Sequence, residues 1–154
     1  MDLYLVQHGV ALSRDEDPSR PLSEVGRFEV EAVARRAAEL RLQLGEIRHS
    51  GKLRAQQTAE ILVKHVAFGS PTSVLRGLDP GDDPLALVPS LEASEAPLTL
   101  VGHLPHLSRL ASLLLCEEPE REVIAFRNGA IVQLVRSDDR WRVRAVLTPE
   151  LAGA

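Results

Sequence analysis

Two short apolar runs, Leu3–Val6 and Leu98–Val101, limit the fold of this chain more than any other feature of the sequence. Neither shows the strict apolar–polar alternation of a strand with one face in water. Each is therefore expected to be a strand covered on both faces, as in a parallel sheet. Such a sheet needs helices on both sides, and the chain between and after the two runs has to supply them.

Helical periodicity fills the intervening chain. Ser23 is placed to cap a helix that reaches about Leu42, because apolar residues recur at i, i+3, i+4, i+7 and i+10 from Val30, and Gly45 is expected to stop it. A second helix should follow a brief strand at 47–50. Its expected apolar face consists of Ala55, Ala59, Leu62 and Val66.

The second half of the chain continues this alternation and then changes. Residues 69–83 are predicted to be a loop with a strand at 73–75, and Asp83-Pro84 is typical of a helix start. After Leu98–Val101, a further helix should bury Leu107, Leu110, Ala111 and Leu114. The segments 130–136 and 140–147 flank a tight connection at 137–139 and predict an antiparallel hairpin.

Together these patterns predict one three-layer α/β domain over residues 1–154. Its central sheet should be mostly parallel, with helices on both faces and a C-terminal antiparallel hairpin. A chain of 154 residues is long enough to bury a core without metals or disulfides.

The composition indicates which kinds of partner the protein is expected to bind and in which cellular compartment it is expected to lie. The net charge of -4 gives no general attraction to nucleic acid or to an anionic membrane. One cysteine, Cys116, cannot form an internal disulfide, and no basic leader or apolar stretch of membrane-spanning length is present. We therefore expect a cytoplasmic protein that binds neither nucleic acid nor membrane.

Histidines and an arginine follow the expected strands. Ligands of parallel sheets gather beyond the carboxyl ends of the strands, where His8-Gly9, Arg54 and His103 should meet. A neutral imidazole can be a nucleophile, Gly9 leaves room for a phosphate beside the backbone, and arginine suits bidentate contact with phosphate. Arg20, just before the first helix, could reach the same edge. The meeting of His8, Arg54 and His103 predicts phosphoryl transfer.

Four separated blocks resemble the histidine phosphatase superfamily, and more narrowly its short SixA-type phosphohistidine phosphatase branch. They contain Gln7-His8-Gly9, Arg20-Pro21-Leu22-Ser23, Ser50-x-x-x-Arg54-Ala55-x-Gln57-Thr58-Ala59 and Val101-Gly102-His103-Leu104-Pro105. The resemblance implies a phosphoglycerate mutase-like fold and a role in signal transduction.

The resemblance also implies roles for individual residues. His8 becomes the nucleophile that accepts phosphate, His103 the second histidine of the pocket, and Arg20 and Arg54 phosphate ligands, with Gln7 and Gly9 beside them. The implied reaction has two steps and needs neither metal nor other cofactor: phosphate passes to His8, and water then releases it. The expected partner is a protein carrying phosphohistidine, or a small phosphate compound.

Gln7 departs from the family pattern, which has arginine immediately before the nucleophilic histidine. A charge-assisted hydrogen bond contributes roughly 1.5 to 3 kcal/mol against about 1 kcal/mol for a neutral one. A loss of about 1 to 2 kcal/mol in the transition state slows a reaction roughly five- to thirtyfold. Two alternatives therefore stay open: a weak or inactive module that binds phosphate or phosphohistidine, and a relay that passes phosphate to a partner.

The other polar residues near these motifs have simpler interpretations. Asp79, Asp82 and Asp83 could protonate a leaving group, but turn and helix-cap roles are favoured. Lys52 should add positive potential without direct contact. His106 is predicted to lie on a helix surface. His49 and His65 lack metal-ligand spacing, and no metal site is proposed.

Overall fold

The sheet of this protein has the strand order β3-β2-β4-β1-β5-β6. The computed structural model describes residues 1–66 and 71–154. Its elements, in chain order, are β1 Asp2–Gln7, α1 Glu24–Glu39, β2 Glu46–His49, α2 Leu53–His65, β3 Ser73–Val74, η1 Pro84–Leu87, α3 Val88–Ala93, β4 Leu98–Gly102, α4 His106–Cys116, β5 Ile131–Ser137 and β6 Arg140–Leu147.

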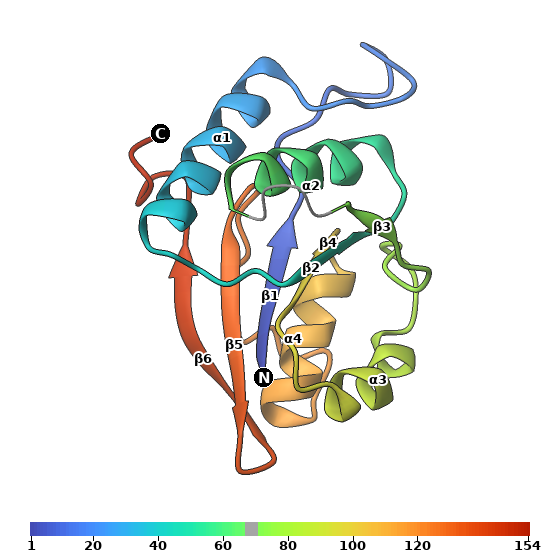
Figure 1. Cartoon of the computed structure of the whole chain (residues 1–154). Coiled ribbons are helices and arrows are strands. Elements are labelled where there is room, and N and C mark those ends of the chain that lie inside the picture. Colours follow the sequence, from blue (N-terminus) through green and yellow to red (C-terminus); the bar gives the residue numbers. More distant parts are fainter. Residues whose placement is uncertain (67–70) are drawn as a thin grey trace.

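The pairing of the strands confirms the predicted fold class. β1 and β2 pair in parallel with β4, β3 pairs in parallel with β2, and the β5–β6 hairpin adds to β1 in antiparallel orientation. The parallel strands therefore end at one edge of the sheet (Figure 1).

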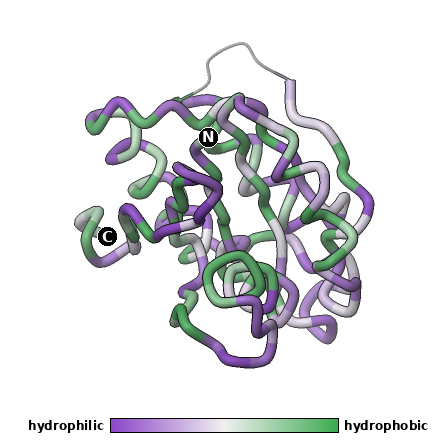
Figure 2. The backbone as a smooth tube through the Cα atoms, turned by 90° about the horizontal axis from the view of Figure 1, so that it is seen from below, coloured by the Kyte–Doolittle hydropathy of each residue, from purple (hydrophilic) through white to green (hydrophobic). Residues whose placement is uncertain are grey.

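The core lies in two layers on opposite faces of β1. Tyr4 and Val6 pack with α1 and α2, whereas Leu3 and Leu5 pack with η1, α3 and α4. All four side chains are almost fully buried, which explains why this strand is apolar at consecutive positions. Hydrophobic and hydrophilic residues alternate along the coiled parts of the backbone, as expected of helices with one buried side (Figure 2).

Ser23 caps α1 as predicted, since its hydroxyl accepts a hydrogen bond from the N–H of Gly26. The end of α1 differs from the prediction. The helix stops at Glu39 rather than near Leu42, because Arg41 adopts a left-handed conformation with φ 55°. The N–H groups of Arg41 and Leu42 then donate to the carbonyls of Ala38 and Ala37, which closes the helix end before Gly45 is reached.

Most of the other predicted elements agree with the structure within a residue or two. β3 covers Ser73–Val74, and the Asp83 side chain caps the short η1 by accepting from the N–H of Leu85. The first residues of the predicted loop, Gly69 and Ser70, lie outside the described part of the chain. Among the described residues, no helix is long and apolar enough to cross a membrane.

Candidate active site

His8 lies directly after β1, and its surroundings identify which ring nitrogen can react. Its Nδ1 is 2.7 Å from the carbonyl oxygen of Gly9. A carbonyl only accepts, so Nδ1 carries the proton and Nε2 is the unprotonated nitrogen that holds the lone pair. The Nε–H of Arg54 donates to this Nε2 over 3.3 Å. The reactive nitrogen is thus Nε2, and it faces a cation.

Arg54 is held in place by the first turn of α2. Its backbone carbonyl accepts from the hydroxyl of Thr58 over 2.8 Å, and that same hydroxyl accepts from the N–H of Gly9 over 3.1 Å. One buried threonine therefore joins the cation and the backbone after the nucleophile.

His103 follows β4 and lies beside His8, with their ring centroids 4.9 Å apart and the rings tilted by 54°. The Nε2 of His103 is 2.6 Å from the hydroxyl oxygen of Ser50, the first residue after β2. The residues that follow three parallel strands thus meet, as the topology rule predicts.

Both site histidines are held neutral. Burial, together with the charges of Arg54 and Arg20, lowers the pKa of His8 to about 4, although its hydrogen bond with the carbonyl of Gly9 raises the pKa. Burial, followed by the proximity of His8 and Arg54, lowers the pKa of His103 to about 3. At neutral pH the site therefore combines a bare imidazole nitrogen with cationic side chains, an arrangement suited to attack on a phosphorus atom whose oxygens those cations neutralise.

Comparison with known proteins agrees with this geometry. No protein-family model matches the chain. The structure of the protein histidine phosphatase SixA complexed with tungstate superposes with a TM-score of 0.84 at 24% identity, and the match covers 97% of each chain. A candidate phosphohistidine phosphatase SixA from Agrobacterium tumefaciens gives a TM-score of 0.75 at 26% identity over 96% of this chain and 97% of its own.

The chain belongs to the histidine phosphatase superfamily.

The chain also has a sequence relative. An uncharacterized protein of Picosynechococcus sp. is 39% identical over 121 residues, which cover 74% of this chain and 73% of the relative.

The structure brings Arg20 and Gln7 near the histidines in different ways. The charge of Arg20 contributes to the lowered pKa of both His8 and Arg54. Its Nε–H donates to the carbonyl of Leu12 over 3.1 Å, so part of the guanidinium already has a partner. Gln7 pairs with Gly102 between β1 and β4. Its buried Oε1 has no hydrogen-bond partner among the described residues.

Gly9 is required for a reason that the sequence did not reveal. A Cβ at this position would lie 2.7 Å from Cγ2 of Val30 and 3.0 Å from the carbonyl oxygen of Gly26, both on α1. The N–H of Gly9 is also taken by Thr58. Close packing against α1 is therefore sufficient to explain the glycine, and the expected room for a phosphate beside it stays a prediction.

The sequence did not predict two hydrogen bonds that hold the backbone at Gln7 and His8. The side-chain amide of Asn128 donates to the carbonyl oxygen of His8 over 2.9 Å, and the N–H of Gly129 donates to the carbonyl of Gln7 over 2.9 Å. Arg127 fixes this loop, because it pairs with Glu29 on α1 and with Glu150 near the C-terminus. No local signal marks Asn128, since its partner lies 120 positions earlier.

Three aspartates that could have been acids have structural partners. Asp79 pairs with Lys52 over 3.5 Å, Asp82 accepts from the N–H of Asp79, and Asp83 caps η1. The favoured turn and cap roles are therefore confirmed for Asp82 and Asp83. Lys52 is the ion-pair partner of Asp79, and its expected role, positive potential without direct contact with phosphate, stays a prediction.

Of the remaining histidines, two are buried and one pairs with a glutamate. His106, the first residue of α4, is fully buried, so its predicted place on a helix surface is wrong. His49 is buried and accepts from the N–H of Gly51, and His65 pairs with Glu31. Within residues 1–66 and 71–154, no three His, Cys, Asp or Glu side chains gather as a metal site.

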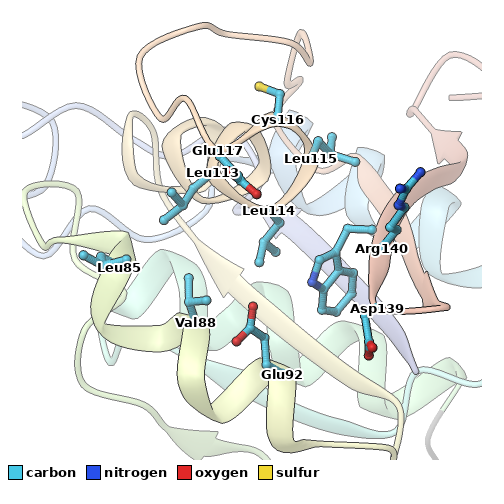
Figure 3. A pocket seen from close by; sticks show the side chains of 11 residues that line it. Leu85, Val88, Glu92, Leu113, Leu114, Leu115, Cys116, Glu117, Asp139 and Arg140 are labelled. Atoms are coloured by element: carbon cyan, nitrogen blue, oxygen red, sulfur yellow. The ribbon is translucent and has the colours of Figure 1, made fainter.

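The protein also has a cavity of about 510 Å³ between α3, the end of α4 and the β5–β6 turn. Val88, Glu92 and Leu114 project into it (Figure 3). Its α4 residues are those farthest along the helix from His103, so this cavity lies away from the convergent histidines. It takes no part in the chemistry of the site.

Proposed function

We propose that this chain is a phosphatase that works through a phosphorylated His8, and that its substrate is phosphohistidine on a protein. The observation that carries the proposal is the unprotonated Nε2 of a neutral His8, which accepts a hydrogen bond from Arg54. The similarity to a protein histidine phosphatase supports the substrate. The cytoplasmic location expected from the sequence stays a prediction.

The proposed reaction has two displacements. In the first, the Nε2 lone pair of His8 forms a bond to phosphorus while the phosphorus–nitrogen bond of the substrate breaks, and solvent protonates the departing imidazole. His8 keeps its Nδ1 proton, so its ring becomes cationic, and the carbonyl of Gly9 stabilises that charge. In the second, water attacks phosphorus, the bond to Nε2 breaks, and neutral His8 and inorganic phosphate result.

The cations around His8 supply the electrostatic part of catalysis. Arg54 and Arg20 would neutralise the phosphate oxygens as charge moves between the entering and leaving groups. His103, buried and neutral, would approach the same oxygens from the β4 side. These roles follow the positions of the matching motif residues.

The test measures phosphate release from a phosphohistidine protein by wild type, His8→Ala and Gln7→Arg. We expect release by wild type and none by His8→Ala. Activity that survives in His8→Ala would remove the nucleophile assignment.

A second candidate, a module that binds phosphate or phosphohistidine without turnover, is favoured by Gln7, which brings no charge beside the nucleophile. It requires that wild type release no phosphate and that Gln7→Arg gain activity. A relay is separated from both by labelling His8, chasing with water alone, and then quenching in alkaline denaturant, because phosphohistidine is lost in acid. Rapid loss of label excludes the relay.

A further inference from the structure

A second, smaller cavity of about 330 Å³ lies between the turn that follows β4 and the segment that leads to β5. Most of its wall is apolar. The apolar lining residues are Leu104, Pro105, Ile124, Ala125 and Phe126. Ser108 and Glu122 complete the lining.

Two segments of the cavity wall continue along the chain into residues that contact His8. Leu104 directly follows His103, whose ring lies beside that of His8. Phe126 is two residues before Asn128, which donates to the carbonyl of His8. Consecutive Cα atoms are about 3.8 Å apart, so each wall begins within one or two residues of a group that contacts His8.

The residues that line the cavity disfavour a substrate with a second anionic group besides its phosphate. Its one charged residue is Glu122, a carboxylate, whereas the cations of the site belong to Arg20, Arg54 and Lys52 outside the cavity. A small polar phosphate compound would leave the apolar walls unfilled, and any additional carboxylate on it would meet Glu122. Leu104 is 39% exposed and Ala125 is exposed, so an incoming apolar group could cover both.

The size of the cavity limits the occupant to a small group. Pockets for drug-sized ligands span about 300 to 1,000 Å³, and this cavity is at the lower end of that range. It is large enough for one bulky side chain together with part of its backbone.

We propose that this cavity is a substrate subsite that receives an apolar side chain next to the phosphohistidine of a protein substrate. The inference rests on the proposed function and deepens it, because the subsite favours a phosphorylated protein over small polar phosphate compounds. Glu122 at the wall adds a preference for a neutral or cationic neighbour of that side chain.

The test is binding, which separates the subsite from catalysis. Peptides carry a non-hydrolysable phosphohistidine analogue, and a single leucine is moved through the flanking positions of an otherwise glycine-rich sequence. We expect wild type to bind the best leucine peptide at least about tenfold more tightly than the all-glycine peptide, as burial of one leucine predicts.

Two matched variants locate the effect. Ala125→Trp fills the cavity and should abolish the leucine preference, while binding of inorganic phosphate stays unchanged. Ala93→Trp makes the same change at an exposed position of α3, next to the opposite end of β4, and should keep the preference. Phe126→Ala, which removes a wall instead of filling the space, should weaken it.

Equal binding of the leucine and glycine peptides would overturn the subsite, as would a leucine preference that survives Ala125→Trp. Binding of inorganic phosphate without binding of any peptide would overturn it as well. A leucine preference together with absent turnover would support the subsite and contradict only the proposed catalysis.

Discussion

A neutral histidine has one bare ring nitrogen, and at His8 the backbone decides which one it is. The carbonyl of Gly9 takes the proton-bearing Nδ1, and Nε2 is left to face Arg54. Burial keeps the ring neutral, and the neighbouring cations act in the same direction. The cations that would bind phosphate therefore also keep His8 unprotonated, which is the form that can act as a nucleophile.

The pH dependence of the reaction should report this neutrality. Because the pKa of His8 is about 4 rather than 6.5, the reactive form persists well below neutral pH, and kcat/KM should fall only as the pH drops through about 4. The unfolded chain binds the extra proton between about 6.5 and 4, so the His8 contribution to folding stability is lost across that same window as the pH falls.

The measurement is a pH–rate profile with a phosphate monoester, since phosphoramidates hydrolyse spontaneously in acid. Circular dichroism at each pH separates unfolding from protonation. A midpoint near 6.5 that persists after correction for the second ionisation of the substrate phosphate, at about 6, would contradict the burial of His8.

Gln7→Arg tests the effect of charge beside the nucleophile. The added guanidinium should raise kcat/KM about five- to thirtyfold, corresponding to about 1 to 2 kcal/mol of transition-state stabilisation. Gln7→Met, which has similar length and no charge, is the matched control and should give no increase. An unchanged rate in Gln7→Arg would mean that Arg20 and Arg54 already suffice.

At the scale of elements, the site depends on segments that touch the backbone of the β1–α1 connection. The loop before β5 holds the carbonyl of His8 through Asn128, and α1 packs against the chain just after His8 through Gly26. Neither segment supplies a reacting group. Both set where the nucleophile lies.

Asn128→Ala should reduce kcat about fivefold to tenfold with little change in KM, because it removes one hydrogen bond worth about 1 kcal/mol that holds His8 in position. Steady-state kinetics measure both constants. Gln43→Ala removes an exposed amide that also donates to a backbone carbonyl, and it should leave both unchanged. A rise in KM alone would indicate substrate contact instead.

Gly26→Ala should destabilise the protein although alanine is normally the better helix former. The new Cβ would lie 2.0 Å from the carbonyl oxygen of Val10, so α1 has to shift, at a cost of about 1 to 3 kcal/mol. Urea denaturation measures the change. Gly81→Ala, with nothing within 4 Å of the added Cβ, is the control. Stabilisation of Gly26→Ala would contradict the close approach.

At the scale of the whole molecule, the candidate site joins parts of the chain that are distant in sequence. Residues after β1, β2 and β4, together with the first turn of α2, surround one point at the sheet edge. Arg127 adds α1 and the C-terminal segment through its pairs with Glu29 and Glu150. An anion bound there would contact several elements at once and stabilise their common arrangement.

Tungstate or phosphate should therefore raise the midpoint of thermal unfolding. At an anion concentration about 100 times its Kd, the stabilisation should be about 2.7 kcal/mol. Arg54→Ala should lose most of this effect, whereas Arg35→Ala, an exposed arginine on α1, should keep it. Equal stabilisation of both variants would place the anion elsewhere.

The sequence by itself determined the elements and the edge at which the chemistry gathers. Apolar runs predict β1 and β4, the Ser23 cap predicts the start of α1, and the order of strands and helices brings His8 and His103 together. These features follow from local patterns combined with a general rule of parallel sheets.

Only the tertiary structure decided the partners of those residues. Thr58 between Gly9 and Arg54, Ser50 beside His103, and Asn128 on the carbonyl of His8 join positions 49 to 120 apart. The burial of His106 and the tight packing of Gly9 likewise depend on neighbours from other elements. A local pattern specifies which face a residue occupies, whereas packing in three dimensions specifies what lies opposite it.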